Sequence, residues 1–294
     1  MSTEKSRGPG PRRLPPVITL FSDFGLADPF VGVMHGVILG ICPAARIVDL
    51  GHEAGRFDPV SAGFALAAAV SYFPRGTIHV AVVDPGVGGP RRPLAARLDG
   101  HLFVAPDNGI LAWLLAAARR AEVRCIADRR LMREPVSATF HGRDVFAPAA
   151  AHLARGHPFP QVGPLVDDPV RPLLPRARPE HGPAVRGRVM WVDRFGNLIT
   201  NVDAAALTAL GEQDGAALVV DVGGRPPAPV VSHYGAVAAG EVAAVVGSSG
   251  HLELFANQGS AAEILGAGTG SPVRVRPGMR SPGPAQAPGA RTRR

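Results

Sequence analysis

The sequence has few cysteines, a single lysine and no long apolar run, and each shortage excludes a class of protein. The two cysteines, Cys42 and Cys125, form no metal-ligand pattern and lie in apolar stretches, as reduced thiols of a cytoplasmic protein do. No run of about 18 apolar residues occurs, so we expect no transmembrane helix. The charged N-terminus has no apolar segment behind it, so we expect no signal peptide. Lys5 is the only lysine, and the preference for arginine therefore points to no site.

Two common nucleotide-binding signatures are also missing. The glycines of residues 86–89 do not make a dinucleotide fingerprint, because Arg91 stands where the third glycine belongs. The loop also follows a later strand than that fingerprint requires. No phosphate-binding loop ending in Lys-Ser or Lys-Thr is present.

The formal net charge of +7 comes from the two ends of the chain. Residues 1–13 carry an excess of three positive charges and residues 280–294 an excess of four, while the remaining 23 basic and 23 acidic residues cancel. Tails rich in Pro, Gly and charge do not form a core, so we predict disordered basic tails at 1–16 and 280–294. The near-neutral body argues against nucleic-acid binding.

Short β-rich runs alternate with helical patterns in the first half of the chain. This alternation predicts an α/β N-terminal domain at 17–170, with a mainly parallel sheet covered by helices on both faces. The predicted strands are 17–23, 45–50, 77–84 and 102–105, and the predicted helices are 29–41, 59–73, 109–121 and 144–155.

The second half of the chain has a different pattern. A Pro-rich stretch, with a linker placed at 171–184, is followed by a region where helical periodicity largely stops. Short strands separated by Gly-rich turns predict a smaller, mainly antiparallel, β-barrel-like C-terminal domain at 185–279. The predicted strands are 187–192, 197–202, 217–222, 230–234, 242–246, 251–255 and 273–275.

Three acidic motifs fall at predicted strand ends. They are Ser-Asp-Phe-Gly at 22–25, Asp-Pro-Gly-Val-Gly-Gly at 84–89 and Pro-Asp-Asn-Gly at 106–109. Ligands of α/β sheets bind outside the carboxyl ends of the strands, so these loops predict a polar pocket rim. Each motif also has a structural interpretation, because Asp-Pro-Gly and Asp-Asn-Gly are turn formers and Asp23 could cap a helix.

Two further segments stand out. In Phe-His-Gly-Arg-Asp at 140–144, a histidine lies between an aromatic residue and a glycine just before a predicted helix, where it could project into a cleft. A satisfied loop histidine is the structural alternative. Residues 193–201 gather an Asp, two Asn and a Phe around a break between two strands. A hairpin turn explains Gly196 and Asn197, but it does not explain the whole set.

Taken together, these motifs resemble the S-adenosyl-L-methionine (SAM) hydroxide adenosyltransferases, or SAM hydrolases, the sister family of the SAM-dependent fluorinases and chlorinases. The resemblance runs from about residue 17 to residue 275. It rests on the order and spacing of all the segments above, with Val-Val-Asp-Pro-Gly-Val-Gly at 82–88 followed by Arg91, and Gly-Ser-Ser at 247–249.

The resemblance implies an α/β domain followed by a β-barrel domain, and a homotrimer with SAM held between subunits. It implies that the catalytic set is Asp84, Arg91 and His141. It also implies that Asp23 binds the ribose hydroxyls, and that Asp193 and Asn197 hold the methionine ammonium and the adenine region. Further substrate-binding candidates are Asn108, Ser249 and Asn257. SAM is then the substrate, and no cofactor or metal is expected.

The reaction implied is the hydrolysis of SAM to adenosine and L-methionine by attack of water or hydroxide on the ribose 5′ carbon. His141 and Asp84 are both candidates for accepting the proton of the attacking water. Two alternatives remain: SAM-dependent halide transfer, and a non-catalytic protein that binds SAM or adenosine. The carboxylate of Asp84 argues against the first because it repels a halide ion, and the complete catalytic set argues against the second.

Overall fold

The computed structural model describes residues 14–55, 57–214 and 217–278, and the chain divides into two compact units, Met1–Leu174 and Pro175–Arg294. The predicted basic tails lie almost entirely outside the described residues, and the finer domain bounds stay predictions.

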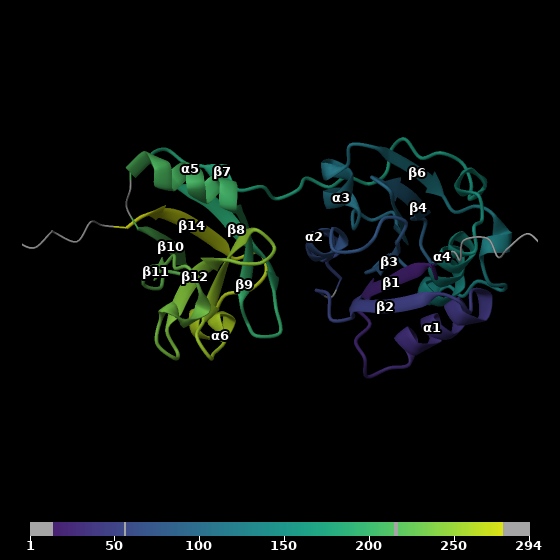
Figure 1. Ribbon diagram of the computed structural model, residues 1–294, viewed down its shortest axis with the longest axis horizontal. Coiled ribbons are helices and arrows are strands. Elements are labelled where there is room, and N and C mark those ends of the chain that lie inside the picture. Colours follow the sequence, from purple (N-terminus) through teal and green to yellow (C-terminus); the bar gives the residue numbers. More distant parts are fainter. Residues whose placement is uncertain (1–13, 56, 215–216, 279–294) are drawn as a thin grey trace, which may run out of the picture. The chain divides into compact units, whose positions relative to one another are not determined.

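The first unit is built on a six-stranded sheet with the order β2-β1-β3-β5-β4-β6 (Figure 1). Strands β2, β1, β3 and β5 pair in parallel, whereas β4 is antiparallel to both of its neighbours. This confirms the predicted mainly parallel sheet. The strands are β1 (Val17–Ser22), β2 (Arg46–Gly51), β3 (Ile78–Val82), β4 (Pro93–Leu98), β5 (His101–Pro106) and β6 (Ala121–Cys125).

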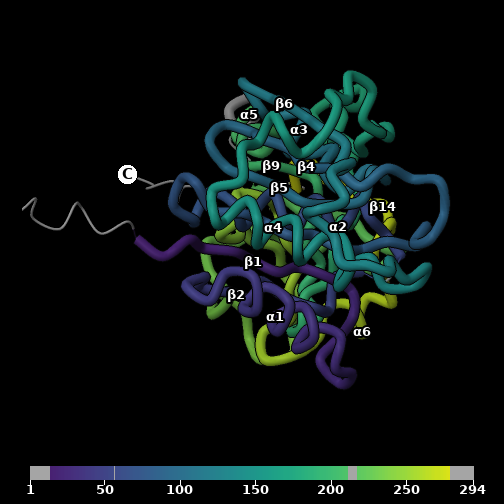
Figure 2. Tube along the Cα trace, turned by 90° about the vertical axis from the view of Figure 1, so that its right-hand side faces the viewer, coloured from purple at the N-terminus to yellow at the C-terminus, as the bar shows by residue number. Residues whose placement is uncertain are grey.

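Helices cover both faces of this sheet, and a separate apolar core lies under each layer. One core packs side chains of α1 and α4 against alternate residues of the central strands, and the other does the same with α2 and α3. Figures 1 and 2 both show α1 next to β1 and β2. The helices are α1 (Phe30–Ile41), α2 (Pro59–Val70), α3 (Ala112–Ala117) and α4 (Ala147–Ala154), with 3-10 turns at Arg129–Leu131 and Phe159–Gln161. A short π-helical turn, Gly142–Phe146, leads into α4.

The second unit is a nearly closed, mainly antiparallel sheet of eight strands. Its order is β11-β10-β14-β8-β9-β13-β12, with β7 paired to β8, and an isolated bridge between Val230 and Ala244 links the two end strands. This confirms the predicted barrel-like domain. The strands are β7 (Arg178–Pro179), β8 (Val185–Val192), β9 (Leu198–Asp203), β10 (Leu218–Val222), β11 (Ala228–Pro229), β12 (Val242–Val246), β13 (His251–Ala256) and β14 (Pro272–Pro277).

Several elements differ from the sequence predictions. The strands β4 and β6 were not predicted, and the predicted helix 109–121 ends at Ala117, after which the chain turns into β6. The predicted strand 230–234 is wrong: β11 stops at Pro229, and Tyr234–Ala236 forms a 3-10 turn. The N–H of Val231 still bonds to the carbonyl of Ala244, but the chain then leaves the sheet, and the N–H of Ala236 turns back to the carbonyl of His233.

Helices α5 (Ala204–Asp214) and α6 (Ala261–Leu265) interrupt the region where only strands were predicted. Both helices begin at a capping side chain. The Asp203 carboxylate accepts the N–H of Ala206 at 2.8 Å, and the Ser260 hydroxyl accepts the N–H of Glu263 at 3.2 Å. Such caps satisfy N–H groups that would otherwise lack a partner in the first turn.

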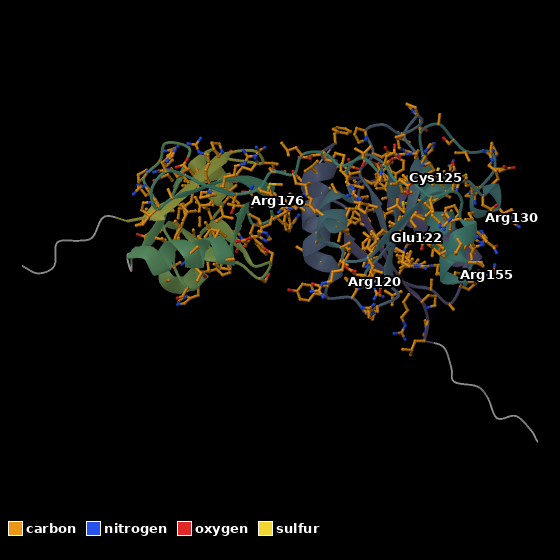
Figure 3. The ribbon with its side chains drawn as sticks, turned by 90° about the horizontal axis from the view of Figure 1, so that it is seen from above. Arg120, Glu122, Cys125, Arg130, Arg155 and Arg176 are labelled. Atoms are coloured by element: carbon orange, nitrogen blue, oxygen red, sulfur yellow. The ribbon has the colours of Figure 1, made fainter. Side chains whose placement is uncertain are left out.

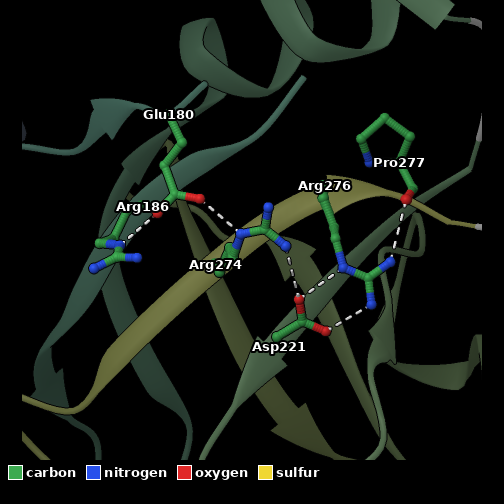
Figure 4. A network of polar contacts seen from close by, with 6 residues as sticks. All are labelled: Glu180, Arg186, Asp221, Arg274, Arg276 and Pro277. Atoms are coloured by element: carbon green, nitrogen blue, oxygen red, sulfur yellow. Dashed lines mark hydrogen bonds and ion pairs between the residues drawn. The ribbon is translucent and has the colours of Figure 1, made fainter. Parts of the chain in front are cut away.

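Charged side chains line the surface of the strands β8, β14 and β10 (Figure 4). Glu180 accepts hydrogen bonds from Arg186 at 2.5 Å and Arg274 at 2.7 Å, and Asp221 accepts one from Arg276 at 2.8 Å. Arg274 lies 3.8 Å from Asp221 and joins the two groups into one network. Exposed ion pairs contribute little to folding stability one by one. Here Arg274 contacts both Glu180 and Asp221, so the charged side chains form one connected network.

Both cysteines are free thiols in the first unit. Cys42 is buried after α1, and Cys125 is half-buried at the end of the edge strand β6, where Figure 3 labels it with Glu122. Burial raises the pKa of the Cys125 thiol, which keeps it protonated and unreactive near neutral pH.

Candidate active site

Three polar loops meet at the carboxyl edge of the first sheet. Asp23 follows β1, Asp84 follows β3 and Asn108 follows β5, and these three strands are immediate neighbours in the order β1-β3-β5. The parallel direction of the strands therefore brings to one edge the loops that were predicted from the sequence.

Asp84, Arg91 and His141 form a contiguous set at this edge. Arg91 donates through Nε to Oδ1 and Oδ2 of Asp84 at 3.1 and 2.9 Å, and through Nη2 to Oδ2 at 2.5 Å. Nη2 of Arg91 also lies 2.6 Å from Nδ1 of His141. The side chains of Arg91 and Asp84 are only 9% and 4% exposed. The fold thus brings together three residues of which the first and last, Asp84 and His141, are 57 positions apart in the sequence.

The contact with Arg91 fixes the protonation state of His141. A guanidinium donates and never accepts, so Nδ1 of His141 is the acceptor and a neutral ring carries its proton on Nε2. Burial lowers the pKa of His141, and the positive charge of Arg91 lowers it further, although the carboxylates of Asp84 and Asp144 and a hydrogen bond to the main chain of Ser137 oppose this. His141 is therefore neutral near pH 7.

The neighbouring main chain holds His141 in place. His141 immediately precedes the π-helical turn, in which Asp144 is 1% exposed. The Asp144 carboxylate accepts the N–H of Ser137 at 2.9 Å and pairs with Arg143 at 2.7 Å, so it clamps both ends of the loop that carries His141. Gly88 lies against this loop, and a Cβ there would collide with the carbonyl oxygen of Ala138.

An apolar cavity of about 110 Å³ lies beside Asp84 and His141. Three aromatic rings form one of its walls, with centroids 5.3–6.0 Å apart and tilted or edge-on contacts: Phe24, Phe30 and Phe140. Val82, Val87, Thr139 and Gly142 complete the lining. A carboxylate and an imidazole at the edge of a small apolar space are suited to controlling a single water molecule.

Asp23 lies in the loop after β1, close to the segment that follows β2. Its Oδ2 accepts the N–H of Phe57 at 3.3 Å, and Oδ1 accepts no hydrogen bond from any residue in the described part of the chain. Phe57 is 72% exposed and has a φ of 60°, a conformation that is unfavourable for a bulky residue. One carboxylate oxygen of Asp23 therefore remains available for a ligand.

Asn108 has both polar ends of its side chain engaged by the main chain. Nδ2 donates to the carbonyl of Val83 at 2.8 Å, and Oδ1 accepts the N–H of Ile110 at 3.3 Å. The residue thus links the end of β5 to the end of β3, directly before Asp84.

The second unit has its own cavity, lined by Asp193, Asn197, Asn257 and the aromatic residues Phe195, Tyr234 and Phe255. Asp193 accepts the N–H groups of Phe195 and Asn197 at 2.8 and 2.9 Å, and its Oδ2 accepts Nδ2 of Asn197 at 2.9 Å. The turn between β8 and β9 therefore presents Asp193 and Asn197 as a fixed pair.

The other two candidates of the second unit are separated by the strand β13. Asn257 follows β13, lines the cavity and donates to the carbonyl of Val237 at 2.7 Å. Ser249 lies in the turn before β13, at the opposite end of the strand, and is not among the residues that line the cavity. Its role stays a prediction.

Several site residues were not singled out from the sequence. Tyr234 donates a hydrogen bond to Glu253, and burial together with this carboxylate raises the pKa of Tyr234 to about 12. His52 was not singled out either, yet it contacts Ser22 next to Asp23. Its position just after a predicted strand, three residues from Asp49, is a signal that could have identified it.

The described residues contain neither a membrane-spanning helix nor a metal-binding cluster. No helix there is long and apolar enough to cross a membrane. No cluster of three or more His, Cys, Asp or Glu side chains in the same residues is arranged to hold a metal ion.

Comparison with known proteins identifies the class that this fold and site define. Residues 18–163 match the SAM hydroxide adenosyltransferase N-terminal domain, and residues 187–274 match the C-terminal domain of the same family. The chain belongs to the SAM hydroxide adenosyltransferase family, which confirms the family predicted from the motifs.

Among curated relatives, a protein of Thermus thermophilus named (R)-S-adenosyl-L-methionine hydrolase is 44% identical over 88% of this chain and 98% of its own length. A protein of the same name from Salinispora tropica is 41% identical over 90% of this chain and 98% of its own length. A fluorinase of Nocardia brasiliensis is 27% identical, covering 90% of this chain and 97% of its own.

Solved structures show the same fold. An uncharacterized conserved protein from Thermotoga maritima superposes with a TM-score of 0.83 and 35% identity, covering 88% of this chain and 99% of its own. A conserved hypothetical protein from Thermus thermophilus gives a TM-score of 0.69 and 40% identity, with the same coverage.

Proposed function

We propose that this protein hydrolyses S-adenosyl-L-methionine to adenosine and L-methionine by attack of water on the ribose 5′ carbon. The observation that carries the proposal is the contiguous set of Asp84, Arg91 and His141 beside an apolar cavity. Relatives at 44% and 41% identity bear the name of this activity.

The charges of the reactants favour this chemistry in an apolar cavity. SAM carries a sulfonium, and its leaving group is a neutral thioether. Displacement by hydroxide therefore cancels one positive and one negative charge, which a water-poor environment promotes. Since the leaving group needs no proton, the difficult step is the deprotonation of water.

Arg91 assists this step but does not complete it. A guanidinium about 4 Å from the water oxygen supplies on the order of 4 kcal/mol at an effective dielectric constant near 20, or about three pK units. The pKa of water then falls from 15.7 to roughly 12–13. A proton acceptor must therefore act together with the attack on carbon.

We assign the acceptor role to Asp84. The lone pair of His141 Nδ1 is engaged by Arg91, and Nε2 carries the ring proton, so a neutral His141 has no nitrogen left to accept a proton. The ring N–H of His141 bonds to the main chain of Ser137, so His141 acts by accepting Nη2–H of Arg91 and holding the guanidinium beside the water. Oδ1 of Asp84 accepts a single hydrogen bond from Arg91 and keeps a free lone pair, and Asp84 lines the same cavity.

The remaining candidates hold the substrate in this proposal. The free oxygen of Asp23 and its partner Oδ2 accept hydrogen bonds from the ribose 2′ and 3′ hydroxyls. Asp193 binds the methionine ammonium and Asn197 binds the adenine edge, while the rings of Phe195 and Tyr234 provide an apolar surface for the base. Asn108 positions the loop before Asp84, and Asn257 orders the loop at the second cavity.

The names of the relatives add a stereochemical detail that the motifs did not contain, namely the (R) configuration. We propose the same preference here. A site distinguishes two sulfonium epimers when it holds the methyl group and the amino-acid chain in different surroundings. The aromatic wall of Phe24, Phe30 and Phe140 suits the S-methyl group, whereas a carboxylate suits the ammonium.

We also propose a homotrimer in which each substrate is shared between two chains, as the family resemblance implies. A heterologous ring of three chains repeats one interface three times and forms three equivalent sites. Light scattering at micromolar protein concentration tests the stoichiometry: a monomer with full activity would contradict it.

One incubation separates the proposed activity from its alternatives. Purified protein is mixed with each SAM epimer, with and without chloride, and the products are separated by chromatography. We expect adenosine and methionine, formed faster from the (R) epimer and independent of chloride. A chlorinated nucleoside would indicate halide transfer, and tight SAM binding without products would indicate a binding protein.

A further inference from the structure

Behind the loop that carries Asp23, four side chains form a continuous chain of hydrogen bonds. Ser22 Oγ lies 2.7 Å from Nδ1 of His52, and Nε2 of His52 lies 3.1 Å from Oδ1 of Asp49. Nε2 of His35 lies 2.9 Å from the same carboxylate oxygen. Ser22 and His52 are only 2% and 4% exposed, so solvent does not compete for the inner links.

The chemistry of these groups fixes the direction of every bond. Burial favours a raised pKa at Asp49, but hydrogen bonds from His35 and His52 outweigh it and the pKa is lowered, so Asp49 is ionised and only accepts. Both histidines therefore donate to it from Nε2. The remaining nitrogen of His52 accepts from the Ser22 hydroxyl, and Ser22 Oγ accepts the N–H of Phe24 at 3.3 Å.

Main-chain hydrogen bonds of the same residues tie the two loops around Asp23 together. The N–H of Gly25 donates to the carbonyl of His52 at 2.7 Å, and the N–H of Ala54 donates to the carbonyl of Ser22 at 3.1 Å. Asp23 lies between these ties and accepts the N–H of Phe57. Ser22 and Gly25, on either side of Asp23, are thus both hydrogen-bonded to the segment that follows β2.

We propose that Asp49, His52 and Ser22 form a positioning relay that orients the Asp23 carboxylate toward the ribose diol. This inference rests on the proposed function, because it assigns the relay to the ribose contact of that site. The relay touches no reacting atom. It acts by restricting the rotation of the main chain at residue 23, so that Asp23 presents both oxygens in one geometry before the substrate binds.

The test compares Ser22→Ala with Thr77→Ala. Both substitutions remove a buried hydroxyl with a single strong bond, but Thr77 bonds to the carbonyl of Pro74 before β3, at the opposite end of the sheet. We expect Ser22→Ala to raise KM for SAM about five- to tenfold with kcat within about twofold. Thr77→Ala should change neither constant.

A second readout reports on the ribose contact directly. Calorimetry measures the affinities of adenosine and 2′-deoxyadenosine, and their ratio isolates the 2′ hydroxyl. We expect the wild-type and Thr77→Ala proteins to prefer adenosine, and both Ser22→Ala and Asp23→Ala to lose most of that preference.

Two variants of His52 distinguish positioning from general stabilisation. Asparagine places its amide near the position of Nδ1 and keeps the bond to Ser22, whereas glutamine reaches toward Asp49 and loses it. We expect His52→Asn to retain a KM closer to wild type than His52→Gln does, although each loses one buried bond.

The outcomes are separable. Equal KM values and equal adenosine preference in the wild-type, Ser22→Ala and both His52 proteins would overturn the relay while leaving the proposed function intact, provided that Asp23→Ala still weakens adenosine binding. A wild-type protein that neither binds adenosine nor hydrolyses SAM would overturn the proposed function and the relay with it.

Discussion

Nη2 of Arg91 lies 2.6 Å from Nδ1 of His141, and this contact makes the histidine a hydrogen-bond acceptor on one side of its ring. Protonation of His141 would place an N–H against the guanidinium and add a second positive charge beside Arg91. The neutral ring is therefore the form that fits the site, and the lowered pKa of His141 expresses the same preference.

The first prediction concerns the pH dependence of kcat/KM. A group with a lowered pKa stays in its neutral, competent form until the pH falls below its ordinary value of 6.5. We expect kcat/KM to be flat from pH 8 to about 6.5 and to fall only below that. An acid limb centred at or above pH 6.5 that disappears in His141→Asn would contradict the assignment of His141 as a neutral residue that accepts from Arg91.

The second prediction concerns the three catalytic residues. We expect Asp84→Ala, Arg91→Ala and His141→Ala each to lower kcat by about 10²–10⁴-fold, because they act on the attacking water. The affinity for SAM should change much less. The triple variant should be far less impaired than the product of the single effects, since the residues act as a unit.

Arg92→Ala is the matched control for Arg91→Ala. Arg92 is the next residue, but it pairs with Asp107 at 2.6 Å and Asp168 at 2.7 Å, outside the catalytic set. We expect it to retain turnover. Single-turnover kinetics and SAM titrations distinguish the two variants, and equal losses of kcat would argue against a specific role for Arg91.

The third prediction tests whether two chains share each site. Asp84→Ala and Asp193→Ala proteins are unfolded together in equal amounts, refolded and assayed at a limiting SAM concentration, where we expect each variant alone to be nearly inactive. If a site takes Asp84 from one chain and Asp193 from another, random assembly leaves about a quarter of the sites intact. Recovery to about a quarter of the wild-type activity supports the shared site, and no recovery would place both residues in one chain.

The fourth prediction concerns acid stability and His79. This histidine is fully buried between Thr19 Oγ1 at 2.8 Å and His101 Nδ1 at 3.2 Å. Burial, and then the charge of His101, lower the pKa of His79 from 6.5 to about 3. The folded state therefore favours the neutral ring of His79. The stability that this neutral ring contributes is fully present above pH 6.5 and is lost as the pH falls toward 3.

We expect the free energy of unfolding of the first unit to fall by on the order of 4 kcal/mol across this window. In a Trp191→Phe background, Trp113 is the only tryptophan, and its fluorescence during urea unfolding reports on the first unit. His79→Gln should flatten the dependence on pH. An equally steep fall in that variant would assign the effect to other groups.

The sequence predicted the fold class because hydrophobic periodicity is a local property. The strand that becomes β3 and the helix that becomes α1 each carry their pattern within a dozen residues. Strand β6 could not be predicted in this way, because its partner β4 makes Ala121–Cys125 a strand by pairing at the sheet edge. Helix α5 was missed because Gly211 and Thr208 weaken its pattern, while the cap at Asp203 decides where it begins.

The candidate site was predictable as a set of motifs but not as a set of contacts. The loops after β1, β3 and β5 meet because those strands are parallel neighbours, which the sequence indicated. The bond between Arg91 and His141 spans 50 residues, and nothing local encodes its direction. His52 escaped notice for the same reason, since its role depends on the buried hydroxyl of Ser22, 30 residues earlier.

The most direct test of the account follows the oxygen atom of the attacking water. The wild-type protein turns over SAM in water enriched in oxygen-18, and mass spectrometry examines both products. We expect one heavy oxygen in the 5′ hydroxyl of adenosine and none in methionine, because the oxygen of the attacking water bonds to the 5′ carbon while the bond from that carbon to sulfur breaks. Label in methionine, or adenosine without label, would contradict it.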